Sequence, residues 1–231
     1  MRPILTFILS LIFGLSNGQD FSYPMINIHG QYINDFIPPG WIIKDIAKGD
    51  LNKDGSADAV IILQHKDSVT LVQAEDSIVT QPRILLILFK NIAGKSYHVS
   101  EQSNSFILNH DNAIMDDPYQ GLTIEKGVLK INFHLFYSMG SWYMTSSSYK
   151  FRYDGKTFIL IGADLSTIHR ATLEFEDYSY NFLAKKRTYS KGNEQKGTKK
   201  TSGRSVFIPS FMTFRTFIQP FTWEVEKNIY L

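Results

Sequence analysis

Apolar and polar residues alternate along the segment Val128-Leu-Lys-Ile-Asn-Phe-His-Leu-Phe136. The apolar residues at 129, 131, 133 and 135 share one face, and the polar residues at 130, 132 and 134 share the other. A period of two is that of a β-strand with one face buried, and it does not suit a helix. The segment therefore predicts a strand, and it favours a fold made of antiparallel sheets, whose strands commonly have one buried face.

Turn signals and further apolar segments extend this pattern. Glu125-Lys-Gly127 precedes the alternating strand, and Asp154-Gly155 is a hairpin dipeptide between Ser148–Tyr153 and Thr157–Ile161. The run Ile84-Leu-Leu-Ile-Leu-Phe89 is apolar throughout, as expected of a central strand with both faces covered. We predict an all-β fold in which antiparallel hairpins form a sandwich or a propeller-like assembly of sheets. Few or no helices are expected beyond the N-terminal leader.

The N-terminus has the pattern of an export signal. Arg2 precedes the apolar run Ile4–Leu15, and a cleavage site between small residues follows at Gly18. The run is too short for a membrane-spanning helix, and no later segment reaches 18 apolar residues. We expect residues 1–18 to be a signal peptide. The mature chain, starting at Gln19, is then periplasmic or secreted and has no membrane span.

Composition narrows the classes of fold and partner. The chain has no cysteine, so a disulfide is excluded and stability must come from the core and from any bound ion. Its net charge of +2 gives no reason to expect nucleic acid as a partner. Residues 19–231 are enough for a sizeable core and predict a single β-rich domain. Within it, mobile loops are predicted near 64–82 and 190–205 because both stretches are polar, the first with a loose hairpin at Val69–Val72 as an alternative.

One loop has the pattern of a calcium site. Side chains with oxygen atoms alternate in Asp50-Leu-Asn-Lys-Asp-Gly-Ser-Ala-Asp58. Calcium takes six to eight oxygen ligands at about 2.3–2.6 Å, and loops of this type supply them from alternate positions. We predict that Ca²⁺ is bound by the side chains of Asp50, Asn52 and Asp54, by the carbonyl of Ser56, and by Asp58 directly or through water.

The surroundings of this loop distinguish it from an EF-hand. Ile61 stands where an EF-hand has its bidentate glutamate, and the flanking segments Trp41–Ala47 and Ala59–Leu63 are short and β-branched. The loop should therefore join two strands, with Gly55 at the sharp turn. The alternative is an ordinary polar turn without an ion, since Asp, Asn and Gly are common turn residues. Repulsion between three crowded carboxylates favours the ion.

The stretch Gly49–Val60 resembles the calcium loop of FG-GAP and VCBS-type repeats, of which this chain has one copy. A longer part, Ile42–Phe182, resembles a group of small exported bacterial proteins that carry a single such loop. The motifs that follow the loop in the same order are Arg83–Phe89, Asp117-Pro-Tyr-Gln-Gly121, Gly140-Ser-Trp142, Phe151-Arg-Tyr153 and Leu160-Ile-Gly162. Some members of that group are similar to periplasmic inhibitors of lysozyme-like peptidoglycan hydrolases, which act as immunity proteins.

The resemblance implies a partner-binding loop. Such inhibitors insert a Ser-Gly-x-Tyr type loop into the cleft of the enzyme. The nearest segment here, Tyr137-Ser-Met-Gly-Ser-Trp-Tyr143, keeps serine, glycine and an aromatic residue in a different order. The expected contact residues are Ser138, Gly140, Ser141, Trp142 and Tyr143. The alternative is that Gly140–Trp142 is only a hairpin turn.

Enzyme signatures are missing from the sequence. There is no thiol nucleophile, no His-Glu-x-x-His spacing among the six histidines and no Gly-x-Ser-x-Gly motif. We therefore expect no catalytic residue and predict a calcium-binding, non-catalytic module with a protein or cell-wall partner. Two alternatives remain: a structural envelope protein without a discrete ligand, and an envelope enzyme acting on glycan. The acids considered for that enzyme are Asp111, Asp116, Asp117 and Glu174.

Overall fold

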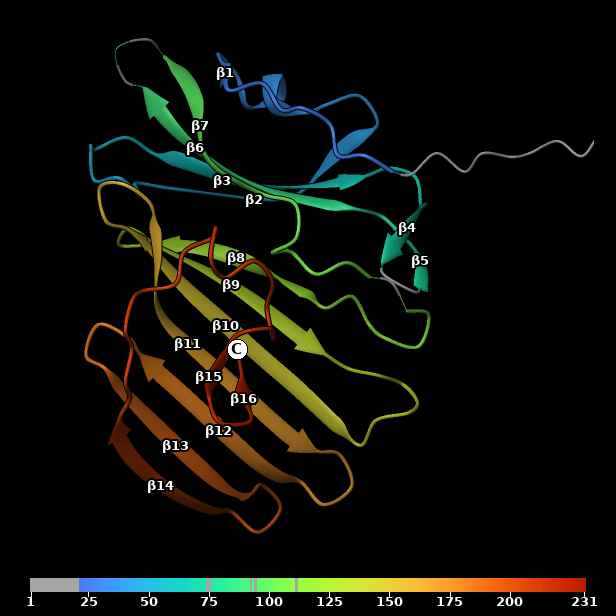
Figure 1. Ribbon diagram of the computed structural model, residues 1–231, viewed down its shortest axis with the longest axis vertical. Helices are drawn as coiled ribbons and strands as arrows, with labels where there is room; N and C mark the ends of the chain where they lie inside the picture. Colours follow the sequence, from blue (N-terminus) through green and yellow to red (C-terminus); the bar gives the residue numbers. More distant parts are fainter. Residues whose placement is uncertain (1–20, 74–75, 92, 94, 111) are drawn as a thin grey trace, which may run out of the picture.

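The computed structural model describes residues 21–73, 76–91, 93, 95–110 and 112–231, so the predicted signal peptide lies outside the described residues. Within the described part the fold is all-β, as predicted, and its one helical element is the short 3-10 helix η1 (Ile33–Phe36). Two antiparallel sheets contain most of the strand residues (Figure 1).

The two sheets have five and seven strands, in the orders β1-β7-β6-β3-β2 and β14-β13-β12-β11-β10-β9-β8. The first sheet contains β1 (His29–Gly30), β2 (Trp41–Gly49), β3 (Asp58–His65), β6 (Arg83–Asn91) and β7 (Ser96–Ser103). The second contains β8 (Tyr119–Glu125), β9 (Val128–Leu135), β10 (Tyr143–Tyr153), β11 (Phe158–His169), β12 (Glu174–Asn181), β13 (Lys186–Asn193) and β14 (Thr198–Ser205). Two short pairs complete the fold: β4 (Val69–Gln73) with β5 (Asp76–Thr80), and β15 (Glu224–Glu226) with β16 (Ile229–Tyr230).

Strand β6 lies inside the five-stranded sheet and is covered on both faces. Leu85 and Ile87 belong to the main core shared with the seven-stranded sheet. Ile84 and Leu86 face a second cluster, which the N-terminal segment covers with Phe36. The sequence prediction of a central strand at Ile84–Phe89 is therefore confirmed, because two apolar layers need an apolar residue at every position.

The main core lies between the two sheets and is rich in aromatic rings. The buried face of β9 is the one predicted from its alternation, with Leu129, Ile131 and Phe133 almost fully buried. The C-terminal segment crosses the same face of the seven-stranded sheet, where Phe214 stacks on Phe151 with ring centroids 4.0 Å apart. The two sheets form a sandwich rather than a propeller-like assembly. The C-terminal segment covers part of the core between them (Figure 1).

The prediction of a mobile loop at 190–205 is wrong, because most of this stretch forms β-strands. β13 and β14 form a regular hairpin there, with Lys186 opposite Ser205 and Asn193 opposite Thr198. The side chains of β14 are exposed throughout, so apolar burial does not explain the strand. Antiparallel pairing satisfies backbone N–H and C=O groups whatever the side chains are, and an edge strand tolerates polar residues. The stretch 64–82 contains the end of β3 and the β4–β5 pair, as the hairpin alternative expected.

Turn lengths also differ in one place from those expected. The hairpin of β10 and β11 forms as predicted, but its turn has four residues, Asp154 to Thr157, rather than two. The Asp154 carboxylate accepts the N–H groups of Lys156 and Thr157, which closes the longer turn. The turn between β8 and β9 is Lys126–Gly127, within the predicted Glu125–Gly127 signal.

Candidate calcium loop and partner-binding loop

The loop between β2 and β3 is organised by hydrogen bonds to its own oxygen side chains. The Asp54 N–H donates to Asp50 Oδ1 at 3.2 Å and to Asn52 Oδ1 at 3.0 Å. The Gly55 N–H donates to Asp50 Oδ2, and the Ser56 N–H donates to Asp54 Oδ1. Gly55 has a φ of 87°, which a residue with a β-carbon rarely adopts. The fold thus brings the side chains of Asp50, Asn52 and Asp54 together.

Asp58 points to the protein interior. Its side chain is 0% exposed; Oδ2 accepts the N–H groups of Leu51 and Asn52, and Oδ1 accepts that of Lys90 in β6. Burial raises the pKa of Asp58, and the three backbone hydrogen bonds act against this rise. A carboxylate has about four lone-pair sites, so direct ligation would use those that these bonds leave. In the fold, Asp58 ties the loop to the start of β3 and to β6.

The donor set agrees with calcium in part. Within the described residues, no three His, Asp or Glu side chains are grouped so that they could hold a metal ion. The loop does offer the carboxylates of Asp50 and Asp54, the Asn52 amide oxygen and the Ser56 carbonyl, and an all-oxygen set is what Ca²⁺ takes. The calcium site stays a prediction. Asp50, Asn52 and Asp54 remain the expected side-chain ligands, and Asp58 is a weaker candidate because its carboxylate already accepts three backbone hydrogen bonds.

The β9–β10 loop, which carries the predicted partner contacts, is fixed by Arg170. Arg170 Nη1 donates to the carbonyls of Tyr137 at 2.8 Å and Ser141 at 3.3 Å. The backbone N–H of Arg170 donates to the Trp142 carbonyl at 2.8 Å. Its guanidinium also lies over the Phe136 ring, 4.7 Å from the centroid. One side chain on the β11–β12 connection therefore holds both ends of the loop.

The serines of this loop are used within the fold. Ser138 donates through both its N–H and its hydroxyl to the Ile114 carbonyl. The Ser141 hydroxyl accepts the Tyr143 N–H and donates to the Tyr143 carbonyl, each at 3.1 Å. Gly140 has a φ of 82°, which the turn requires. Ser138, Gly140 and Ser141 thus shape the loop, while its large side chains face solvent.

Three large side chains project from this fixed backbone. Trp142 is 66% exposed, Tyr143 is 55% exposed and Met139 is 65% exposed. His169 stacks with Trp142 at 6.1 Å and meets Tyr143 edge-on at 5.0 Å, which orients both rings. Exposed apolar side chains gathered in one place mark binding sites, and Trp and Tyr are favoured there. Met139 and Arg170 were not predicted, because neither belongs to the Gly-Ser-aromatic pattern.

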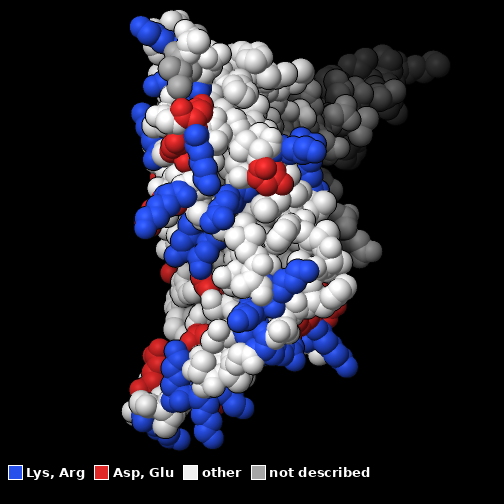
Figure 2. Space-filling view, turned by 90° about the vertical axis from the view of Figure 1, so that its left-hand side faces the viewer, with Lys and Arg blue, Asp and Glu red and all other residues white. Residues whose placement is uncertain are grey.

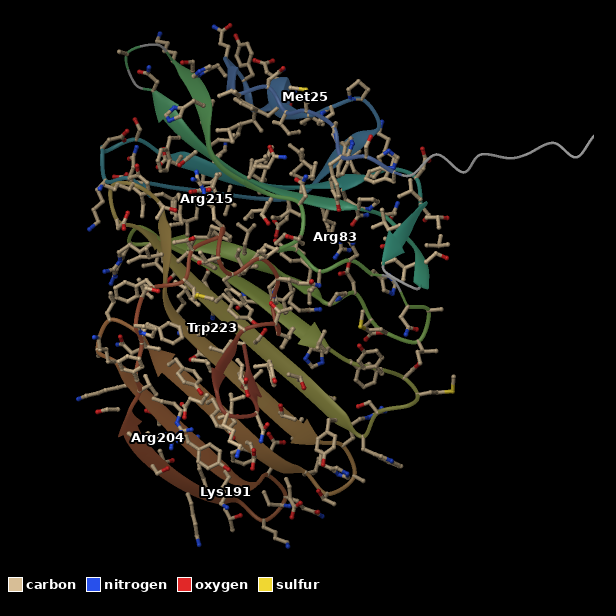
Figure 3. The ribbon with its side chains drawn as sticks, in the orientation of Figure 1. Met25, Arg83, Lys191, Arg204, Arg215 and Trp223 are labelled. Carbon is tan, nitrogen blue, oxygen red and sulfur yellow. The ribbon has the colours of Figure 1, made fainter. Side chains whose placement is uncertain are left out.

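The Asp-Pro-Tyr-Gln-Gly motif proves to be a brace between the sheets. The Asp117 carboxylate accepts two hydrogen bonds from Arg83, at 2.8 and 2.7 Å, and one from Lys44 at 2.8 Å. Arg83 is 2% exposed and lies between the two sheets (Figure 3). The Tyr119 hydroxyl donates to Asp45 Oδ2 at 2.7 Å. Burial alone would raise the pKa of Asp117, but the bonds from Arg83 and Lys44 lower it to about 2.

These contacts bear on the acids considered for a glycan-active enzyme. A carboxyl group with a pKa of about 2 holds no proton near neutral pH, so Asp117 is not suited to act as a general acid. Asp111 lies outside the described residues. Glu174 and Glu176 line an open hollow of about 800 Å³ on the seven-stranded sheet, where Glu176 accepts hydrogen bonds from the hydroxyls of Tyr178 and Tyr189.

No protein-family model, curated protein or solved structure matches the chain. The resemblance to exported proteins with a single calcium loop therefore stays a prediction. Across the described residues, no helix has the length and apolar character needed to cross a membrane.

Proposed function

We propose that this protein is an exported, calcium-binding β protein that acts as a non-catalytic binding module. The observation that carries the proposal is the fixed β9–β10 loop, which presents Met139, Trp142 and Tyr143 to solvent. Aromatic side chains on a preorganised backbone lose little conformational entropy on binding, so more of the contact energy appears as affinity. The sandwich behind the loop supplies a rigid support.

The partner we propose is a lysozyme-like peptidoglycan hydrolase of the cell envelope, which the chain would inhibit as an immunity protein. Support comes from the three large exposed side chains of the loop, because apolar side chains of this size can fill a concave surface such as a substrate cleft. The contact residues would be Trp142, Tyr143 and Met139. Ser138, Gly140 and Ser141 would keep the loop in shape.

Replacing Trp142 and Tyr143 together with alanine is expected to weaken partner binding at least thirtyfold, since truncation of an anchoring residue costs about 2 kcal/mol or more. The readouts are inhibition of lysozyme-type muramidases on a cell-wall suspension and capture of envelope proteins by the immobilised chain. Phe207→Ala is the matched control, because Phe207 is also exposed and aromatic but lies outside the loop.

The outcomes separate the candidate functions. If wild-type chain in excess leaves every muramidase fully active and captures no envelope protein, the binding-module proposal is wrong. If the chain alone releases sugar from the cell wall, the alternative of a glycan-active enzyme is correct instead.

Calcium is expected to raise the melting temperature of the protein. At a calcium concentration a hundredfold above the dissociation constant, binding adds about 2.7 kcal/mol to the free energy of unfolding. Asp50→Ala and Asp54→Ala should each abolish this rise, while Asp67→Ala, an exposed carboxylate outside the loop, should keep it. Thermal unfolding with calcium and with a chelator measures the difference. Identical curves for the wild type in both conditions would exclude the site.

A further inference from the structure

Five hairpin turns lie at one end of the two sheets, on the left-hand side of Figure 1. They connect β2–β3, β6–β7, β8–β9, β10–β11 and β12–β13, and we call this end the turn face. Each turn carries one exposed lysine, and these turn lysines are Lys53, Lys95, Lys126, Lys156 and Lys185. The β2–β3 and β8–β9 turns touch, since a β-carbon at Gly127 would lie 3.7 Å from Lys53 Cε.

The turn lysines form an array of free charges. In the seven-stranded sheet, successive turns on this face are two strands apart, which places Lys126, Lys156 and Lys185 at intervals of about 10 Å. None of the five forms an ion pair within the described part of the chain. In the view onto this side of the molecule, lysine and arginine side chains cover more of the surface than aspartate and glutamate side chains do (Figure 2).

The carboxylates of the same turns accept hydrogen bonds from backbone N–H groups. Asp50 and Asp54 accept N–H groups of the β2–β3 loop, and Asp154 accepts those of its own turn. At the other end of the sheets Asp67 follows Lys66, and Glu194 and Lys196 share one turn, while Arg170 adds one positive charge that is bound to the β9–β10 loop. The turns of the turn face thus carry five lysines against three aspartates, and the turns at the other end carry three basic side chains against two acidic ones.

The backbone of these turns does not favour lysine. Lys53, Lys95, Lys126 and Lys185 have φ values of 64°, 48°, 51° and 51°, a region in which a β-carbon is unfavourable and Gly or Asn is preferred. In the two-residue turn of Lys126 and Gly127 both φ values are positive, and Asn-Gly is the preferred pair for such a turn. A role for the charge would account for lysine at positions where local conformation disfavours it.

We propose that the turn face docks on an anionic lipid membrane surface. Ammonium groups spread over separate turns fit a laterally extended layer of negative charge better than one compact anion. Each lysine close to an anionic bilayer strengthens binding about fivefold. Leu183, 48% exposed beside Lys185, adds an apolar contact at the level of the headgroups. The described turn residues of this face include no arginine and no exposed aromatic ring, which nucleic-acid sites commonly use.

The test is sedimentation of the purified chain with vesicles of phosphatidylcholine containing 30% phosphatidylglycerol, at low salt and with a chelator to exclude calcium bridges. The turn variant combines Lys53→Asn, Lys126→Asn, Lys156→Gln and Lys185→Asn, and it should bind at least a hundredfold more weakly. Because Asn suits a positive φ, this variant should unfold at the same temperature as the wild type or higher. The matched control replaces the same number of exposed lysines elsewhere: Lys66→Gln, Lys191→Gln, Lys196→Gln and Lys200→Gln.

The control variant is expected to lose less than fivefold in affinity for the anionic vesicles. Pure phosphatidylcholine vesicles should bind none of the three proteins through charge. The proposal is overturned if the wild type does not prefer the anionic vesicles, or if its loss in the turn variant is less than tenfold. Equal losses in the two variants would also overturn it, because total charge would then be the cause. So would tighter binding of a DNA duplex through the same lysines at the same salt.

Discussion

Asp58→Ala is expected to lower the free energy of unfolding by about 3–5 kcal/mol, because it leaves three backbone N–H groups without their acceptor. Those groups belong to Leu51 and Asn52 in the loop and to Lys90 in the neighbouring strand. The Leu51 N–H is buried, so water cannot readily replace the lost bond. Urea unfolding of the two proteins, both in chelator, measures the difference.

Asp54→Ala in the same chelator is the control, and it should cost less than about 1 kcal/mol because the Asp54 side chain is at the protein surface. The two carboxylates belong to one sequence pattern, so this comparison separates a structural role from a ligand role. If Asp58→Ala and Asp54→Ala destabilise equally without calcium, the inward role assigned to Asp58 is wrong.

The sequence predicted the strands wherever burial leaves a pattern in the residues. β9 alternates because one face is buried, and β6 has a continuous apolar run at Ile84–Phe89 because both of its faces are buried there. β13 and β14 leave no such pattern: they pair through the backbone at a solvent-exposed edge, and their polar side chains look like those of a loop. β13 pairs with the neighbouring strand β12, and the residue pattern within β13 or β14 alone does not indicate such a pairing.

The candidate site was predicted only in part, because the sequence shows contiguous motifs but not the contacts between distant residues. Asp50–Asp58 and Ser138–Tyr143 are contiguous, so their motifs can be seen in the sequence. Arg170 comes from another connection and reaches the β9–β10 loop only in the folded chain. The turn lysines are likewise separated in the sequence, and the net charge of +2 hides their concentration at one end. Long-range contacts, rather than residue types, are what the sequence left undetermined.

The motif around Asp117 illustrates how a conspicuous pattern can serve the fold. Its charged and aromatic residues would suit a site, yet Asp117 is occupied by Arg83 and Lys44, and Tyr119 by Asp45. These contacts link β8 and the segment before it to β2 and β6 of the other sheet. The order of these motifs along the chain can therefore reflect how the two sheets are joined.

Asp117→Ala is accordingly expected to lower the free energy of unfolding by about 3 kcal/mol at pH 7, because it leaves the buried Arg83 guanidinium without its counter-charge. The value lies at the lower end of the range for buried pairs, since Asp117 is itself about one-third exposed and Arg83 keeps hydrogen bonds to the Leu108 carbonyl and to Gln64. Lys44→Met, which keeps the Arg83–Asp117 pair, is the control and should cost less than about 1 kcal/mol.

The dependence of this effect on pH identifies its cause. The pKa of Asp117 is lowered in the folded state from 3.8 to about 2, so the folded protein holds fewer protons on this group than the unfolded chain between these values. The stabilisation is therefore complete above pH 3.8 and is lost as the pH falls toward 2. The gap between wild type and Asp117→Ala in urea unfolding should stay constant from pH 7 to pH 5 and narrow progressively below pH 4. A gap that persists unchanged at pH 2.5 would mean that Asp117 acts by packing rather than by charge, and the ionic brace between the sheets would have to be abandoned.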